Sequence, residues 1–320
     1  MTSTTCNICG CGELKFIQSI EAIKYDPERY FDLFQCPVCG LTFIYPMPDI
    51  GANNKIYFSD NYSPHDISLA KPSAVRRKFV NKLRELIFCR GNRSHLIYFV
   101  HKLYNTFTYR SVPYYIPNGK ILDIGCGLGY YLQMMKKMGW QEYGVELNQH
   151  AVQFAKENLG LNVQKGRFED AEFPENHFDI ITLWHSLEHS VDPKYVLQKA
   201  KKYLKPEGSL FLGIPNFNSA DHLLFKKYWN GFEIPLHIYH FTPETIKYLL
   251  QRAGFDNIHV FHTIRPSDMA KSIINMTNHF LGKKTSVPLQ ASLALLFIWP
   301  AFSTCLLQRS SIIKIIASPA

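Results

Sequence analysis

The chain has 320 residues, of which 46% are hydrophobic, so it can bury a core of ordinary size and is not an intrinsically disordered protein. Its formal net charge of +9 is local, because ten of the 35 Lys and Arg residues lie between positions 71 and 110, where Glu85 is the one acid. Anionic lipid headgroups, a phosphorylated substrate or RNA would suit this basic segment, and a solvated helical face without a partner is the alternative.

The first residues, Met1 to Thr5, carry neither a basic stretch nor an apolar stretch of the kind that directs secretion. We therefore expect the chain to reside in a reducing cytoplasm. In that compartment, eight cysteines are better interpreted as metal ligands and buried thiols than as a disulfide framework.

Two Cys-x-x-Cys-Gly knuckles stand near the N-terminus, and their four thiols are Cys6, Cys9, Cys36 and Cys39. Four thiolates at this spacing can surround a tetrahedral Zn²⁺ ion, and a site with four protein ligands is structural rather than catalytic. Cys11 is a spare thiol that could replace Cys9. The pattern predicts a small zinc-binding module that ends near Pro48.

A buried strand at 120–124 runs into the glycine-rich turn 125–129, and an apolar helix is expected at 131–138. Asp123 precedes the turn, where a carboxylate is a poor neighbour for a pyrophosphate but can help to hold a cationic ligand. A second short strand ends at Glu146, the position from which an acidic residue reaches ribose hydroxyls in such folds. These signals together predict a nucleoside-binding site.

Strands and helices then alternate, which predicts a parallel sheet covered on both faces. The expected elements are a helix at 149–158, strands at 162–165 and 178–183, a helix at 193–203, a Pro-Glu-Gly turn, a strand at 209–214, and a final antiparallel pair at 258–263 and 311–316. Thr242 is expected to cap a further helix, with Pro243 in its first turn.

The Asp-x-Gly-x-Gly-x-Gly run at 123–129, Glu146, Phe178-Asp179 and the Leu-Lys-Pro-x-Gly run at 204–208 resemble the class I S-adenosylmethionine-dependent methyltransferases over about residues 118–260. The resemblance implies an α/β fold with a Rossmann-like seven-stranded sheet. It also implies S-adenosylmethionine as the cofactor, with the glycines at its methionine end, Asp123 near its amino group and Glu146 on its ribose. Gly-Arg-Phe at 166–168 departs from the Gly-Asp-Ala common in the family, so Phe168 is expected to stack on the adenine. The full expected cofactor-binding set is Asp123, Gly125, Cys126, Gly127, Gly129, Glu146, Phe168 and Trp184.

The segment Trp184-His185-Ser186-Leu187-Glu188-His189 follows the fourth strand, whose carboxyl end borders the transferred methyl group in this fold. An inverted zinc-protease motif, a divalent-ion site and hydrogen-bonded structural histidines are alternatives to a general base. The segment 229–244 resembles zinc-ribbon-bearing bacterial methyltransferases encoded among surface-polysaccharide and lipid biosynthesis genes, and it brings His237 and His240 toward the same pocket. The expected catalytic residues are His185, His189 and His240.

No charged residue occurs from 285 to 308, yet the final strand pair must form from either side of this stretch. An apolar hairpin broken at Pro300 that dips into the inner leaflet, or a helical lid over the substrate, would satisfy that topology, whereas a single membrane crossing would not. The expected organisation is a zinc-ribbon-like module at 1–48, a basic connector at 49–117, the methyltransferase core at 118–265, an apolar helical insertion at 266–309 and a last core strand at 310–320.

Methyl transfer to oxygen or carbon of a sugar, lipid-linked or isoprenoid-type small-molecule acceptor is the leading functional prediction. RNA methylation through the zinc module and basic arm is the first alternative, and the apolar insertion argues against a nucleic-acid partner. An inactive zinc-ribbon interaction protein is the second, and the intact glycine loop and Glu146 argue against it.

Overall fold

The computed structural model describes residues 5–22, 26–48, 110–111, 113–114, 116–282 and 295–320. Most of the expected basic connector and part of the apolar insertion therefore lie outside the described residues. The strands are β1 (Lys15–Ala22), β2 (Asp26–Gln35), β3 (Thr42–Tyr45), β4 (Lys120–Ile124), β5 (Gln141–Glu146), β6 (Val163–Lys165), β7 (Phe178–Trp184), β8 (Leu204–Pro215), β9 (Tyr239–His240), β10 (Phe255–His262) and β11 (Ile312–Pro319). The helices are α4 (Tyr130–Lys137), α5 (Gln149–Leu159), α6 (Pro193–Tyr203), α7 (Ala220–Phe225), α8 (Pro243–Arg252), α9 (Pro266–Leu281) and α11 (Ile298–Leu306), with short 3-10 turns η2 (Phe168–Asp170), η3 (Leu187–His189) and η4 (Lys226–Tyr228).

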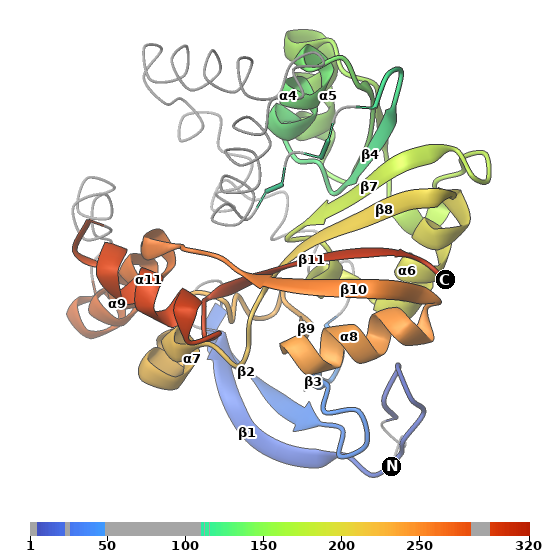
Figure 1. Ribbon diagram of the computed structural model, residues 1–320. Coiled ribbons are helices and arrows are strands. Elements are labelled where there is room, and N and C mark those ends of the chain that lie inside the picture. The colour runs from blue at the N-terminus through green and yellow to red at the C-terminus, as the bar shows by residue number, and fades with distance from the viewer. Residues whose placement is uncertain (1–4, 23–25, 49–109, 112, 115, 283–294) are drawn as a thin grey trace.

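The central layer is a seven-stranded sheet of order β10-β11-β8-β7-β4-β5-β6 (Figure 1). The strands from β8 to β6 run parallel, and β11 and β10 close the other edge in antiparallel fashion. The central strands bury apolar side chains on both faces, which are covered by α4 and α5 on one apolar cluster and by α6 and α8 on the other. The expected α/β class and seven-stranded sheet are confirmed.

The last strand returns to the middle of the antiparallel edge. β11 lies between β8 and β10, with Ile316 opposite His259 and Lys314 opposite Phe261. The predicted pairing of the strands on either side of residues 266–309 is confirmed. The helical segment is thus an excursion from the sheet edge that begins and ends at neighbouring strands.

One local prediction needs correction. The Pro-Glu-Gly turn at 206–208 is a bulge inside β8, since Leu204 pairs with Phe178 and Ser209 with Ile180, and the register shift absorbs the extra residues. Pro300 lies just after an interruption of the helical path, since Leu295 and Leu296 are helical, Phe297 is a turn residue and α11 begins at Ile298. Pro300 itself lies in the first turn of α11, where a missing backbone N–H costs no helical hydrogen bond.

The N-terminal module forms a second sheet that includes a strand of the core. Its order is β1-β2-β3-β9, and Phe43 of β3 pairs with Tyr239 of β9. Ile20, Phe31 and Leu33 of the module are buried in the same apolar cluster as α6 and α8. The module is therefore packed onto the core below α8 and continues its hydrophobic interior (Figure 1).

Helix boundaries follow side-chain caps. Asn148 caps α5, Asp192 caps α6 with Pro193 in the first turn, and Thr242 caps α8 with Pro243 next to it, as predicted. Among the helices that the structure describes, none has both the length and the apolar character needed to cross a bilayer.

Candidate functional site

The glycine loop joins β4 to α4. Gly125, Gly127 and Gly129 all have positive φ angles, of 73°, 56° and 79°, a region that residues with a side chain rarely adopt. A Cβ atom on Gly129 would lie 2.6 Å from Leu161 Cδ1 and 3.2 Å from Ala155 Cβ, so this glycine allows the start of α4 to pack closely against the end of α5. A Cβ atom on Gly127 would meet no heavy atom within 4 Å, so this part of the loop faces open space.

Glu146 fixes the loop from the end of the neighbouring strand β5. Its Oε2 accepts a hydrogen bond of 2.8 Å from the Gly127 backbone N–H, and its Oε1 accepts one of 2.8 Å from the Asn148 backbone N–H. The side chain is 7% exposed and lines the cavity. A carboxylate with spare lone pairs is therefore held at the position expected for binding ribose hydroxyls.

Asp123 lies behind the loop and is not among the residues that line the cavity. Thr182 Oγ1 donates a hydrogen bond of 2.6 Å to its Oδ1. Burial raises the pKa of the Asp123 carboxyl to about 7, against the opposing effect of that hydrogen bond. In this structure its contact supports the loop, and the expected position next to a cofactor amino group stays a prediction.

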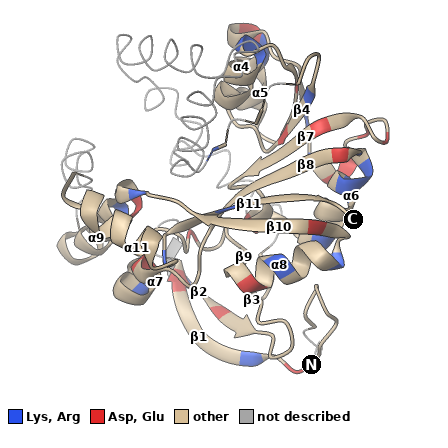
Figure 2. Cartoon of the chain, viewed as in Figure 1, with Lys and Arg blue, Asp and Glu red and all other residues tan. Residues whose placement is uncertain are grey.

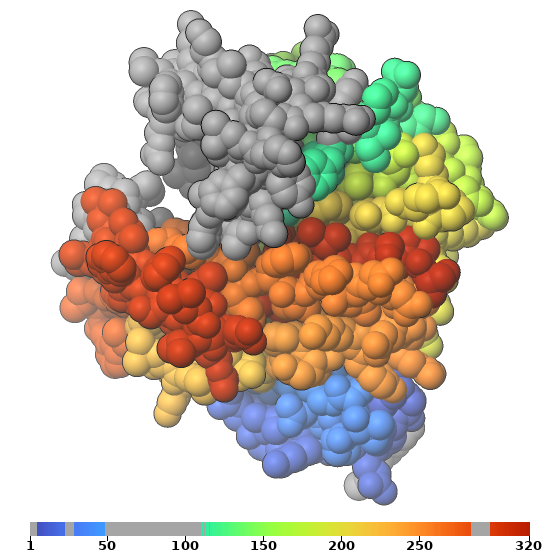
Figure 3. Space-filling view, in the orientation of Figure 1, coloured from blue at the N-terminus to red at the C-terminus, as the bar shows by residue number. Residues whose placement is uncertain are grey.

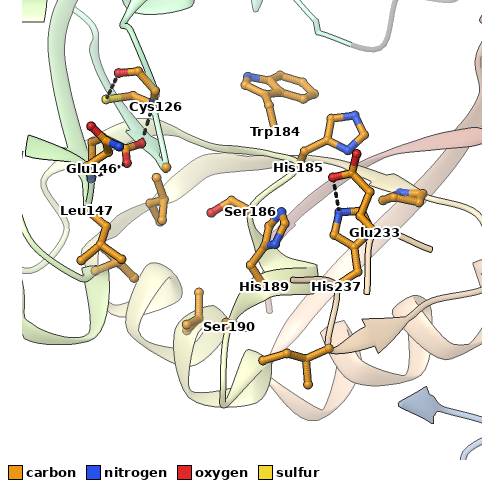
Figure 4. Close-up of a pocket in the computed structure, with 18 of the residues that line it drawn as sticks. Cys126, Glu146, Leu147, Trp184, His185, Ser186, His189, Ser190, Glu233 and His237 are labelled. Atoms are coloured by element: carbon orange, nitrogen blue, oxygen red, sulfur yellow. Dashed lines mark hydrogen bonds and ion pairs between the residues drawn. The ribbon is translucent and has the colours of Figure 1, made fainter. Parts of the chain in front are cut away.

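The cavity has a volume of about 560 Å³ and opens at the carboxyl ends of the parallel strands (Figure 4). Cys126 and Glu146 form one side, and the histidine segment forms the other. Phe168 and Trp184 are 4% exposed and line it, held by edge-on contacts with Tyr203 and Tyr131 respectively. Its volume is in the range of small-molecule sites. The open glycine, the carboxylate and the apolar walls fit a ligand with a nucleoside and an amino-acid end, as S-adenosylmethionine has.

His185 and Glu188 begin the histidine segment. His185 follows β7 with a positive φ of 56°, and its Nδ1 lies 3.2 Å from Glu188 Oε1. The Glu188 side chain is 1% exposed. Burial alone would raise its pKa, but the hydrogen bond from His185 and the charges of three neighbouring histidines outweigh burial, so the pKa is lowered. A buried carboxylate is thus kept ionised among imidazoles.

His189 lies against His237, with ring centroids 4.6 Å apart. Its Nδ1 is 3.0 Å from the Leu236 carbonyl oxygen, which can only accept, so Nδ1 carries the proton and Nε2 the lone pair. Burial, and then the charge of His237, lower the pKa of His189 to about 4. His189 is therefore neutral at neutral pH and presents the imidazole form that a general base requires.

His237 and Glu233 are functional candidates that the predicted catalytic set lacked. His237 Nδ1 lies 2.8 Å from the Gly231 carbonyl oxygen, while its Nε2 faces Glu233 Oε2 at 3.6 Å and Glu188 Oε1 at 4.0 Å. Both residues line the cavity (Figure 4). The four-residue spacing from Glu233 to His237 was the signal available in the sequence. Glu188, His189 and His237 together also offer three ligand atoms close enough for a metal ion.

His240 is not brought to the cavity. It is 3% exposed, stacks among Phe217 and Phe232, and is absent from the lining residues. Burial, and then the charge of His237, lower its pKa well below the usual value. The structure thus brings His185 and His189 together with His237, while His240 belongs to an aromatic cluster behind them.

The four predicted cysteine ligands converge in the N-terminal module. The Sγ atoms of Cys6 and Cys39 are 3.5 Å apart and those of Cys9 and Cys36 are 3.4 Å apart, and all four lie within 4.8 Å of one another. A tetrahedral Zn²⁺ with Zn–S bonds of ~2.3 Å separates its sulfurs by about 3.8 Å, so the donor set fits. Cys11 stays outside the cluster, and its Sγ contacts the Glu13 carbonyl oxygen.

The two knuckles repeat one backbone pattern. The N–H groups of Gly10 and Gly40 donate to the carbonyls of Cys6 and Cys36, at 2.8 and 2.9 Å, and both glycines have positive φ. The hydrogen bond from Cys39 lowers the pKa of the Cys6 thiol to about 5. The Cys6 thiol, although buried, is therefore ionised more readily than a free thiol, as a metal ligand must be.

Comparison with known proteins supports the class of the core. A family model described as a methyltransferase domain matches residues 94–260. Ubiquinone biosynthesis O-methyltransferases of Haemophilus ducreyi and Actinobacillus pleuropneumoniae are 34% and 33% identical over 117 and 115 residues, each match covering 33% of this chain and 49% of the relative. The chain thus spans about half the length of these curated relatives. A solved S-adenosylmethionine-dependent methyltransferase from Archaeoglobus fulgidus is 21% identical, with a TM-score of 0.45 over 75% of this chain and 99% of that one. Because the family match spans the glycine loop and the run of parallel strands, the chain belongs to the class I S-adenosylmethionine-dependent methyltransferases.

Proposed function

We propose that the protein transfers a methyl group from S-adenosylmethionine to an oxygen or carbon atom of a small-molecule acceptor, with His189 as the general base. The observation that carries the proposal is that His189 faces the cavity as a neutral imidazole, its Nδ1 proton engaged by the Leu236 carbonyl. The bound cofactor supplies an electrophilic methyl group on a sulfonium. The protein must then orient the acceptor and accept its proton.

Two carboxylates near His189 bear on the uptake of that proton. When His189 Nε2 takes a proton, the new positive charge lies beside His237, which is itself next to the carboxylates of Glu188 and Glu233. The charges of Glu188 and Glu233 raise the pKa of His189 and so offset part of the lowering that burial and His237 cause. His185, bonded to Glu188, holds that carboxylate in place.

The proposed acceptor class is a sugar, a lipid-linked sugar or an isoprenoid-type molecule. The two relatives described above are named for O-methylation in ubiquinone biosynthesis. This supports an oxygen atom as the methyl acceptor, on a molecule with an isoprenoid part. In this chain Lys271 of α9 lines the cavity and is a cation that suits an anionic group on the acceptor, whereas Arg265 before α9 is paired with Asp268. We also propose that the four-cysteine cluster holds a structural Zn²⁺ ion.

Binding of the cofactor is tested first, by calorimetric titration with S-adenosylmethionine and S-adenosylhomocysteine. Glu146→Gln and Gly127→Arg should each weaken binding at least about tenfold, because hydrogen bonds to charged groups contribute ~1.5–3 kcal/mol. Glu142→Gln is the matched control, since Glu142 lies at the other end of β5 and pairs with Lys136. Unchanged affinity in both loop variants would contradict the assigned site. No binding by the wild-type protein would favour an interaction protein.

The base is tested by incorporation of labelled methyl groups into lipid and sugar extracts. His189→Gln should abolish incorporation and keep cofactor affinity, because His189 does not contact the glycine loop. His150→Gln, an exposed histidine of α5, is the control. Full incorporation by His189→Gln would move the role of base to His185 or His237.

A further inference from the structure

The helices that leave the sheet edge carry most of the exposed apolar surface of the described chain. Ten of the seventeen large hydrophobic residues that are exposed belong to α7, α9, α11 and their ends. We call these ten residues the helical patch: Leu223, Leu224, Phe280, Leu281, Leu295, Leu296, Ile298, Trp299, Leu306 and Leu307. In the space-filling view α9 and α11 form a projecting shoulder beside the body of the molecule (Figure 3).

The size of the patch is unusual for a protein surface. Trp299 and Phe280 are 77% and 72% exposed, and together they present on the order of 300 Å² of apolar surface. The largest apolar patch of a typical monomer is about 300–600 Å² in total, and the eight further residues add to this value. Such a surface marks a contact with another apolar phase.

α7 and α11 pack against α9, but α11 buries little apolar surface in these contacts. α7 and α11 both contact α9, and Ala301 is the one residue of α11 that is buried. Beside Trp299 there is a hollow of about 240 Å³, lined by Ile264, Ile298, Trp299 and Phe302 and by no polar side chain. A hollow of this kind accepts a hydrocarbon segment rather than a polar ligand.

Positive charge borders the patch. Lys226 and Lys227 follow α7, Arg309 follows α11, and all three are exposed. One exposed neighbour, Lys227, contacts Glu21 of β1 at 3.5 Å. The two acids of these helices, Asp221 and Asp268, are buried and bonded to Ser311 and Arg265. α11 itself carries no charged residue and is uniformly tan in Figure 2.

We propose that the helical patch docks on the surface of an anionic phospholipid bilayer. The apolar side chains would enter the acyl region, and the tryptophan would lie at the membrane–water interface. The neighbouring lysines would contact the anionic headgroups. No crossing of the bilayer is required. Docking in itself does not depend on methyl transfer, and its consequence for the acceptor rests on the proposed function.

That consequence follows from α9. Its first turns line the cavity with Arg265, Asp268 and Lys271, and its last turn carries Phe280 and Leu281 of the patch. A molecule docked by the patch therefore presents one side of its cavity within about the length of one helix, roughly 24 Å, of the lipid surface. An acceptor with a lipid tail could reach the cavity while its tail stays in the bilayer.

The experiment uses the full chain and vesicles of phosphatidylcholine with or without phosphatidylglycerol. We expect co-sedimentation with the anionic vesicles that weakens with salt, and little with phosphatidylcholine alone. The chain has four tryptophans, of which Trp140, Trp184 and Trp229 are buried. Quenching of tryptophan fluorescence by brominated acyl chains therefore reports on Trp299.

Variants locate the contact. Leu306→Asp with Leu307→Asp should abolish vesicle binding, and Trp299→Ala should weaken it roughly tenfold, since burial of a large apolar side chain contributes ~1.5–3 kcal/mol. Tyr195→Ala is the matched control, because Tyr195 is 45% exposed on α6 and belongs to none of the helices that carry the patch. Its binding should equal that of the wild type.

The outcomes separate the alternatives. Absence of binding to anionic vesicles, or equal binding by the double aspartate variant, overturns the proposal. So does a lipid-free dimer in sedimentation velocity that the double aspartate variant abolishes, which would make the patch a contact between two copies of this chain. Calorimetry with S-adenosylhomocysteine on the same samples verifies folding, and it distinguishes a failed docking proposal from a failed methyltransferase assignment.

Discussion

The Tyr239 hydroxyl joins the first cysteine knuckle to the histidine segment, and the variant Tyr239→Phe removes this link. Asn7, between Cys6 and Ile8 of the knuckle, donates from Nδ2 to the hydroxyl oxygen at 2.7 Å. The hydroxyl donates in turn to the Val191 carbonyl oxygen at 2.9 Å, two residues after His189. The ring itself is 2% exposed and packs near Phe43, so phenylalanine fills the same space.

The magnitude follows from the two lost hydrogen bonds. Each contributes about 0.5–1.5 kcal/mol net, and both are partly buried, so Tyr239→Phe should lower the free energy of unfolding by about 1–3 kcal/mol. In a protein of this size that corresponds to a decrease in Tm of roughly 1.5–4.5 °C. Asn7→Ala alone should cost less, because Asn7 is exposed.

A double-mutant cycle with Asn7→Ala measures the link by urea unfolding, and hydrogen exchange follows the peptide 186–192. We expect a coupling energy of about 0.5–1 kcal/mol and faster exchange in that peptide in either single variant. Tyr195→Phe, an exposed tyrosine of α6, is the control. Strict additivity of the two substitutions, with unchanged exchange at 186–192, would refute the reasoning. Affinity for S-adenosylhomocysteine should stay the same throughout.

Three further predictions concern the metal cluster, the glycine loop and the base. Cys36→Ser should lower the bound zinc measured by mass spectrometry, whereas Cys11→Ser should not; equal zinc in all three proteins would contradict the cluster. Gly129→Ala should cost about 2 kcal/mol in urea unfolding, because φ is +79° and the new Cβ lies 2.6 Å from Leu161 Cδ1. The folded pKa of His189, about 4, lies below the unfolded value of ~6.5, so stability should fall as the pH decreases from 6.5 to 4, by at most about 1.4 kcal/mol per pH unit. His189→Gln should flatten that slope, and an unchanged slope would show that His189 does not carry it.

The local part of the site could be predicted from the sequence because its signals are short. The glycine loop, Glu146 and the two cysteine knuckles each occupy a few consecutive residues, and their geometry is fixed by positive φ at glycine and by adjacent backbone hydrogen bonds. The final antiparallel pair could also be predicted, because the family topology requires it and both segments are apolar. The cap of α8 at Thr242 could likewise be predicted, because its signal lies within a few consecutive residues.

The contacts between distant segments could not be predicted in this way. Whether His240 or His237 faces the cavity depends on the path of the segment after α7 across the end of the sheet. In β9 the His240 side chain points away from the cavity and packs against Phe217 and Phe232. Asp123 directly precedes the glycine loop, the position expected for a residue near the cofactor amino group. In the structure, however, its carboxylate accepts a hydrogen bond from Thr182 on the neighbouring strand. The pairing of β3 with β9 left no pattern in the sequence, since β9 has only two residues.

The pairing of β3 with β9 offers a route by which a metal in the N-terminal module could influence the histidine segment at the cavity. The Ile44 N–H donates to the Ile238 carbonyl at 3.0 Å, and the Ile238 N–H donates to the Glu188 carbonyl at 2.9 Å. One residue thus connects β3 to the turn that carries His189. Since the glycine loop and Glu146 lie across the cavity, removal of the metal should loosen the histidine segment and leave the cofactor site intact. A structural zinc would then act on methyl transfer through the position of the base alone.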